Sequence, residues 1–128
     1  MEIVTENPVT LAWMGDAIYS LKVRKTLFDL GLRKADVLQK RAAKYNSAVG
    51  QAAVLDLLEE QALLNEDEKE IVRRGCNAHV KSPAKNASLK TYLKATGLEA
   101  LFGYLYLYHH EERMEELLDV CMKLGENL

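Results

Sequence analysis

The chain has 128 residues, of which 48% are hydrophobic and 28% are charged, and its formal net charge is −2. This length and composition fit one globular domain, residues 1–128, and exclude a disordered or fibrous protein. With only two cysteines and no apolar run long enough to span a bilayer, we expect a reduced cytoplasmic chain that has neither a disulfide framework nor a membrane anchor.

The near-neutral net charge hides two basic blocks. Residues 22–45 and residues 69–94 carry most of the Lys and Arg residues, and acidic residues dominate between and around these blocks. Blocks of this kind are ordinarily solvated helix faces. If the fold places them on one side of the molecule, they form a positive surface suited to a phosphate backbone.

The first half of the chain predicts three helices. Asn7, followed by a proline, is a typical helix start, and the helix that begins there is expected to end near Gly31. A short basic helix is predicted over residues 34–45. A core helix is predicted over residues 48–58, where apolar residues recur at the spacing of an inward-facing stripe.

The second half of the chain is also helical. Asn65 and Glu68 have the spacing of a capping box and predict the start of a helix. Residues 77–88 contain a proline and no apolar period, so they predict a basic loop. Residues 98–108 predict a helix buried on every side, and residues 111–124 predict an amphipathic covering helix. No strand pattern is present, so the fold class is predicted to be all α.

Two apolar helical stretches each contain a single charged residue. Asp16 is the lone charge in residues 10–21, and Glu99 is the lone charge in residues 98–108. No Lys or Arg stands three or four residues away from either acid, so an ion pair within the helix is not available. An ionised carboxylate in such surroundings has to be neutralised, paired or bound to a metal ion.

Small residues beside both acids would let the two helices cross closely and bring the carboxylates together. Gly15 and Ala17 flank Asp16, and Ala100 and Gly103 lie close to Glu99 in the chain. Two acids in one dry site repel each other unless a cation lies between them, and oxygen ligands suit Mg²⁺ or Mn²⁺. The alternative is that each acid caps a helix or meets a distant Lys or Arg.

Trp13 is predicted to lie on the same face of the first helix as Asp16. That helix is then apolar on two sides, one for the core of the domain and one for a second subunit. The alternative is a monomer in which other helices of the same chain cover Trp13.

The two acidic stretches resemble the ribonuclease III family. Residues 11–19, Leu-Ala-Trp-Met-Gly-Asp-Ala-Ile-Tyr, are similar to the signature helix of that family, and residues 98–107 are similar to its later acidic helix. Residues 73–78 and 83–86 look like a loop of its short Mini-III branch, which consists of the catalytic domain alone. The resemblance covers residues 8–126 and implies the helical fold of the ribonuclease III catalytic domain.

Two positions depart from the family pattern. Classical members carry a Glu four residues before the Asp, where this chain has Ala12, and an Asp three residues before the Glu, where it has Thr96. The resemblance to Mini-III is strengthened by this loss of acids, because that branch shares it. The number of metal ions in the site is left open.

The resemblance implies a homodimer that cleaves double-stranded RNA with Mg²⁺, or with Mn²⁺, in the maturation of 23S ribosomal RNA precursors. It implies that Asp16 and Glu99 are catalytic and hold the metal, and that Trp13 enters a socket on the partner subunit. The residues expected to grip the A-form duplex through its phosphates are Lys40, Arg41, Lys44, Arg73, Arg74, Lys81 and Lys85.

Two other functions remain open at this stage. The first is a non-catalytic RNA-binding or scaffold protein on the same fold, degenerate at Ala12 and Thr96. The second is a helical protein-interaction domain unrelated to RNA, which rests on composition alone.

Overall fold

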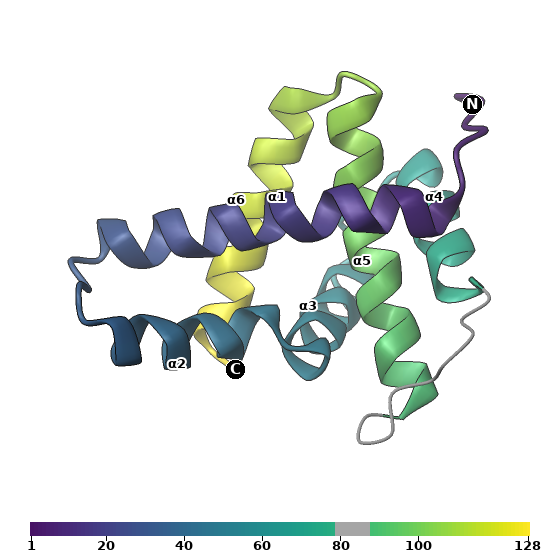
Figure 1. The fold of residues 1–128 in the computed structure, drawn as a ribbon. Helices are drawn as coiled ribbons and strands as arrows, with labels where there is room; N and C mark the ends of the chain where they lie inside the picture. Colours follow the sequence, from purple (N-terminus) through teal and green to yellow (C-terminus); the bar gives the residue numbers. More distant parts are fainter. Residues whose placement is uncertain (79–87) are drawn as a thin grey trace.

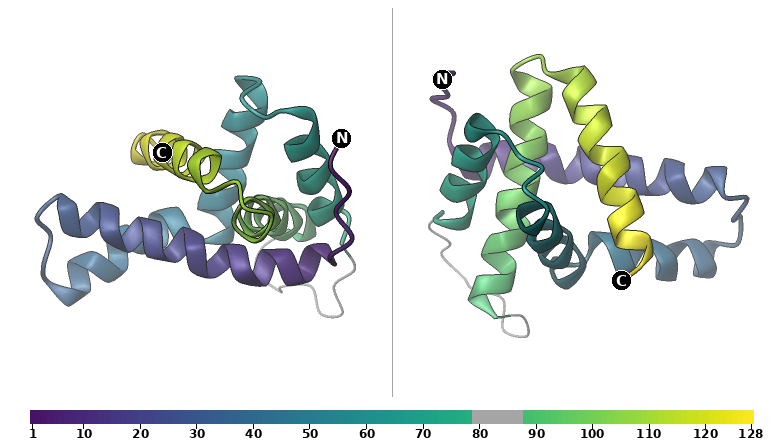
Figure 2. Two further views of the ribbon diagram at one scale, coloured as in Figure 1. Left: turned by 90° about the horizontal axis from the view of Figure 1, so that it is seen from above. Right: turned by 180° about the vertical axis from the view of Figure 1, so that it is seen from behind.

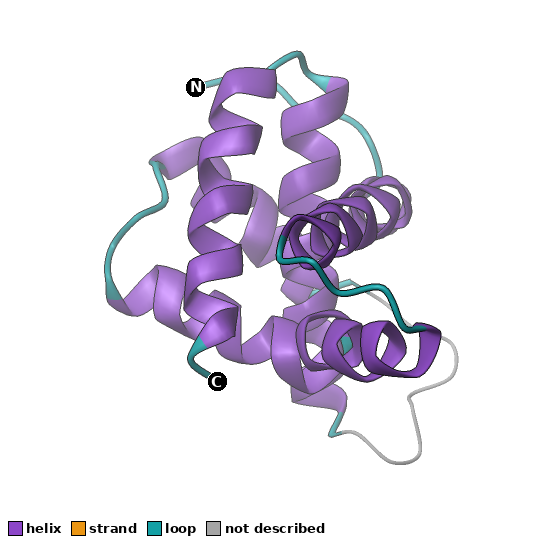
Figure 3. Ribbon diagram, turned by 90° about the vertical axis from the view of Figure 1, so that its left-hand side faces the viewer, coloured by secondary structure: helices purple, strands orange, loops and turns teal. Residues whose placement is uncertain are grey.

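The computed structural model describes residues 1–78 and 88–128, and all the regular structure in these ranges is α-helical (Figures 1 and 3). The prediction of an all-α fold is therefore confirmed. The helices are α1 (Pro8–Asp29), α2 (Ala35–Asn46), α3 (Ala48–Glu60), α4 (Glu66–Cys76), α5 (Leu89–Leu107) and α6 (Glu111–Glu126). None of these helices is long and apolar enough to cross a membrane.

Side chains cap the first turn at the start of α1, α3 and α4. The Asn7 side chain accepts a 2.8 Å hydrogen bond from the second residue of α1, and Ser47 caps α3 in the same manner at 3.1 Å. At the start of α4, Asn65 and Glu68 exchange two hydrogen bonds of 2.9 Å, which confirms the capping box. Local hydrogen bonding of this kind satisfies backbone N–H groups that have no partner inside the helix.

Helix α5 is the central element of the fold. It packs against α1, α3, α4 and α6, and it runs antiparallel to α6 after a tight turn (Figures 1 and 2). Every residue from Ala95 to Leu105 is buried except Glu99, which is half-buried. The predicted burial on all sides therefore holds for most of this helix and ends at Tyr106, which is exposed.

Helices α1 and α5 cross in direct backbone contact. A Cβ atom built on Gly15 would lie 1.6 Å from the carbonyl oxygen of Glu99, and one on Gly103 would lie 1.9 Å from the carbonyl oxygen of Leu11. These distances are far shorter than any real contact, so only glycine fits at the two positions. The close crossing predicted from the small residues is present.

A buried ion pair joins α4 to α6. Glu68 is 1% exposed, and Arg113 donates hydrogen bonds of 2.8 and 2.9 Å to its two carboxylate oxygens. Arg113 also donates to the Leu63 carbonyl oxygen at 2.7 Å. Since these residues lie far apart in the sequence, the spacing of charges gave no sign of the pair.

Replacing Gly15 by Ala is expected to lower the free energy of unfolding by about 2 kcal/mol or more, because the added methyl group meets a backbone carbonyl. Urea denaturation measures the change. Gly31→Ala is the matched control: no atom lies within 4 Å of its added Cβ, and only its φ of 92° opposes the substitution, at a cost of about 1 kcal/mol. A Gly15→Ala protein as stable as its parent would contradict the backbone contact.

Candidate active site

The crossing of α1 and α5 brings Asp16 and Glu99 into contact. Burial raises the pKa of Glu99 first, and a hydrogen bond to Asp16 and the negative charge of Asp16 raise it further, to about 8. With its pKa raised in this way, Glu99 favours its protonated form beside Asp16. Asp16 is exposed at the edge of the site and Glu99 is half-buried behind it, so the pair is open to solvent on one side.

The described part of the chain supplies no cation that neutralises this pair. Within residues 1–78 and 88–128, no Lys, Arg or His forms an ion pair with Asp16 or Glu99. The same ranges hold no group of three or more His, Cys, Asp or Glu side chains that could hold a metal ion. A pair of carboxylates next to solvent fits Mg²⁺ or Mn²⁺, which keep several waters and need only one or two protein carboxylates.

The two positions that lack an acid are both buried. Ala12 and Thr96 are each 7% exposed. The Thr96 hydroxyl donates a 3.1 Å hydrogen bond to the Tyr92 carbonyl oxygen, one turn earlier in α5. It is therefore used inside its own helix, so neither position adds a carboxylate to those of Asp16 and Glu99.

Gln51 of α3 is a third polar residue at the site, and the sequence analysis missed it. Its side chain is 2% exposed, and its amide lies close enough to Glu99 to lower the pKa of that carboxyl. The Nε2 atom completes no hydrogen bond with the described residues. One signal was present in the sequence, because Gln51 shares the inward spacing of Leu55 and Leu58 on α3.

The predicted RNA-binding residues form two separate groups in the described part of the chain. Lys40, Arg41 and Lys44 are exposed on α2, and Arg73 and Arg74 lie in the last turn of α4. These helices lie at opposite ends of the molecule, α2 below α1 and α4 beside the N-terminus (Figures 1 and 2). The remaining two, Lys81 and Lys85, lie outside the described residues.

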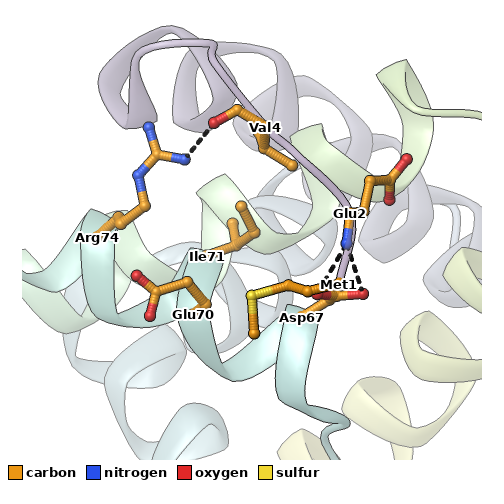
Figure 4. Close-up of a pocket in the computed structure, with 7 residues that line it drawn as sticks. All are labelled: Met1, Glu2, Val4, Asp67, Glu70, Ile71 and Arg74. Atoms are coloured by element: carbon orange, nitrogen blue, oxygen red, sulfur yellow. Dashed lines mark hydrogen bonds between the residues drawn. The ribbon is translucent and has the colours of Figure 1, made fainter.

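Both arginines of α4 have partners in the chain. Arg74 donates a 3.0 Å hydrogen bond to the carbonyl oxygen of Val4 (Figure 4). It donates another of 2.8 Å to the carbonyl oxygen of Glu6, and together these bonds hold the N-terminal segment against α4. Arg73 forms an ion pair with Glu70 on the same helix. These contacts give each arginine a structural role that the charge pattern did not predict.

Trp13 lies on the outside of α1. Its side chain is 75% exposed, so the described part of the chain does not cover it. The other described helices therefore do not bury Trp13, contrary to the alternative of a monomer that covers it. Val9, one helical turn earlier, is 44% exposed and extends the apolar surface.

Known proteins share both the sequence and the fold. The family model of the ribonuclease III domain matches residues 9–110. Among solved structures, a crystal structure of a Fusobacterium nucleatum protein is similar, with a TM-score of 0.81, 28% identity and coverage of 93% of each chain. The fold and the crossing of the two acidic helices thus define a ribonuclease III domain.

Curated relatives narrow this class. Mini-ribonuclease 3 of Enterococcus faecalis is 43% identical, over 94% of this chain and 92% of its own, and that of Brevibacillus brevis is 46% identical, over 94% and 88%. The chain belongs to the Mini-ribonuclease 3 branch of the ribonuclease III family, and it is an endoribonuclease.

Glu99→Gln is expected to stabilise the protein at high pH. The folded chain holds a proton at Glu99 up to a pKa of about 8, whereas the ordinary pKa is 4.5, so ionising this residue lowers stability as the pH rises between these values. In EDTA, the variant should unfold at a higher urea concentration than the parent at about pH 9, and the difference should shrink toward pH 4.5.

The matched control is Glu112→Gln, which removes an acid from the exposed surface of α6. Its urea midpoint should not rise relative to that of the parent as the pH increases from 4.5 to about 9. A Glu99→Gln protein with the same pH dependence of stability as its parent would contradict the raised pKa of Glu99.

Proposed function

We propose that Asp16 and Glu99 are the catalytic pair of this endoribonuclease and that they hold Mg²⁺, with Mn²⁺ as an alternative. The observation that carries the proposal is the contact between the two carboxylates, which no described cation of the protein balances. As a member of the ribonuclease III family, the enzyme cleaves double-stranded RNA. Its phosphodiester substrate is itself anionic, so the site needs positive charge that the described residues do not supply.

The two carboxylates have different tasks in this proposal. When bound, a divalent ion lowers the pKa of a water molecule and stabilises negative charge on the phosphate. Asp16 is exposed to solvent, so it can bind a hydrated ion that also contacts the RNA. Glu99 has to release its proton first, so ion binding should be weaker at acidic pH.

Double-stranded RNA is proposed to be held mainly by shape and by its phosphates. A-form RNA hides its base edges in a deep and narrow major groove, so Lys and Arg side chains meet the backbone instead. Lys40 and Arg41 are exposed on α2, and neither forms an ion pair with the described residues. We propose that they bind RNA together with Lys44, Arg73, Arg74, Lys81 and Lys85.

The substrate we propose is a precursor of 23S ribosomal RNA, in the cytoplasm. We also propose that the active enzyme is a homodimer in which Trp13 enters a socket on the partner subunit. A large aromatic side chain left 75% exposed on a long helix is costly in water, and burial against a second copy removes that cost.

Asp16→Asn and Glu99→Gln are each expected to reduce the cleavage rate by about 1,000-fold or more, because each removes a charge that holds the metal ion. Cleavage of a labelled RNA duplex with and without Mg²⁺ measures the effect, and circular dichroism checks the fold. Asp29→Asn, on an exposed residue of the same helix that pairs with Lys25, is the matched control and should cleave normally. Normal activity in both site variants would refute the proposal. Duplex binding without any metal-dependent product in the parent would favour a scaffold role.

Trp13→Ala is expected to weaken dimer association by about 30-fold or more, the effect of losing about 2 kcal/mol at an interface centre. Sedimentation equilibrium at several protein concentrations measures the change. Phe28→Ala, another exposed aromatic on α1 at 54% exposure, is the control and should leave association unchanged. A Trp13→Ala protein that dimerises as tightly as the parent would remove Trp13 from the interface.

A further inference from the structure

Gln51 is a buried polar side chain directed at the candidate metal site. It lies in the first part of α3, only 2% exposed, and its Nε2 atom has no hydrogen-bond partner within the described residues. The group beside that amide is the carboxyl of Glu99, on a different helix. A third helix therefore contributes to the place where α1 and α5 cross.

An unsatisfied buried donor is unfavourable for the fold. A buried N–H group without a partner costs about 1–3 kcal/mol of stability. An apolar side chain of the same shape at this position would not carry this desolvation penalty. Helix α3 places Leu55 and Leu58 on the same inward face. A third apolar residue at position 51 would thus serve packing better than an amide does.

The amide suits the ionised form of Glu99. A protonated carboxyl donates to Asp16, but an ionised one is purely an acceptor and can take a hydrogen bond from a neighbouring N–H. Helix α3 packs directly on α5 and places the buried Gln51 amide within reach of the Glu99 side chain. An uncharged N–H donor can bind the Glu99 carboxylate and still leave the site open to a divalent ion, whereas a Lys or Arg side chain would compete with that ion.

We propose that Gln51 is a positioning residue, which donates a hydrogen bond from Nε2 to the ionised Glu99 carboxylate and holds it beside Asp16 for the divalent ion. This inference rests on the proposed function of the two acids. Residues that orient a metal ligand typically change metal affinity or activity by about 10–100-fold when they are removed. The role is more important here because Ala12 and Thr96 supply no further carboxylate.

The test is Gln51→Met, which keeps the length of the side chain and removes the amide. Binding of Mn²⁺ without RNA is measured by titration calorimetry, and the Mg²⁺ concentration for half-maximal cleavage is measured in parallel. We expect Mn²⁺ to bind about 10-fold or more weakly and the half-maximal Mg²⁺ concentration to rise by a similar factor. The cleavage rate at saturating Mg²⁺ should change far less, and the urea midpoint should stay the same or rise.

Thr96→Val is the matched control, since it removes a buried hydroxyl beside the same site that bonds to Tyr92 instead of Glu99. It should bind Mn²⁺ like the parent. Unchanged Mn²⁺ affinity in Gln51→Met would overturn the positioning role, whatever its urea midpoint. Failure of the proposed function looks different: the parent itself would bind no Mn²⁺, or Asp16→Asn would bind it as the parent does.

Discussion

The contact between the backbones of α1 and α5 is the constraint on which the site depends. Gly15 lets the two helices approach so closely that a Cβ atom at this position would clash with the backbone of α5. Gly103, one turn after Glu99 on α5, does the same against the backbone of α1. Asp16 follows Gly15 directly, and Glu99 supplies the carbonyl oxygen that Gly15 faces. The residues that set the distance between the helices are therefore neighbours of the residues that we propose carry the chemistry, and a change in helix packing would change the site.

The site works against the stability of the fold. Glu99 is held in surroundings that favour its protonated form, next to an acid that repels its charge, and Gln51 leaves a buried donor that has no partner among the described residues. A core selected for packing alone would contain none of these features. Such local conflicts are typical of functional sites, where binding of a ligand resolves them. A divalent ion would offset the charge of both acids and allow the Gln51 amide to complete its hydrogen bond.

Helix α1 links the site to the outer surface of the molecule. It carries Gly15 and Asp16 at the crossing with α5, and Trp13 on its uncovered side. An interface at Trp13 would thus lie within one helical turn of the acids. The basic residues are divided between α2 and α4 at the two ends of the molecule, and the hydrogen bonds of Arg74 to the N-terminal segment show that a basic block also has structural partners. A long RNA duplex could reach both groups, whereas a small ligand could not.

The sequence by itself determined the helices and the two acids. Asn7, and the Asn65 and Glu68 pair, begin helices through hydrogen bonds to residues two or three positions away, so the pattern that encodes them is local and readable. The partnership of Asp16 and Glu99 was also predictable, because a lone charge in an apolar stretch needs an explanation and small residues lay beside both. Only the tertiary structure decided that Gln51 faces Glu99 and that Arg113 pairs with Glu68. These contacts join residues from different helices, and no spacing along the chain records which helices will meet.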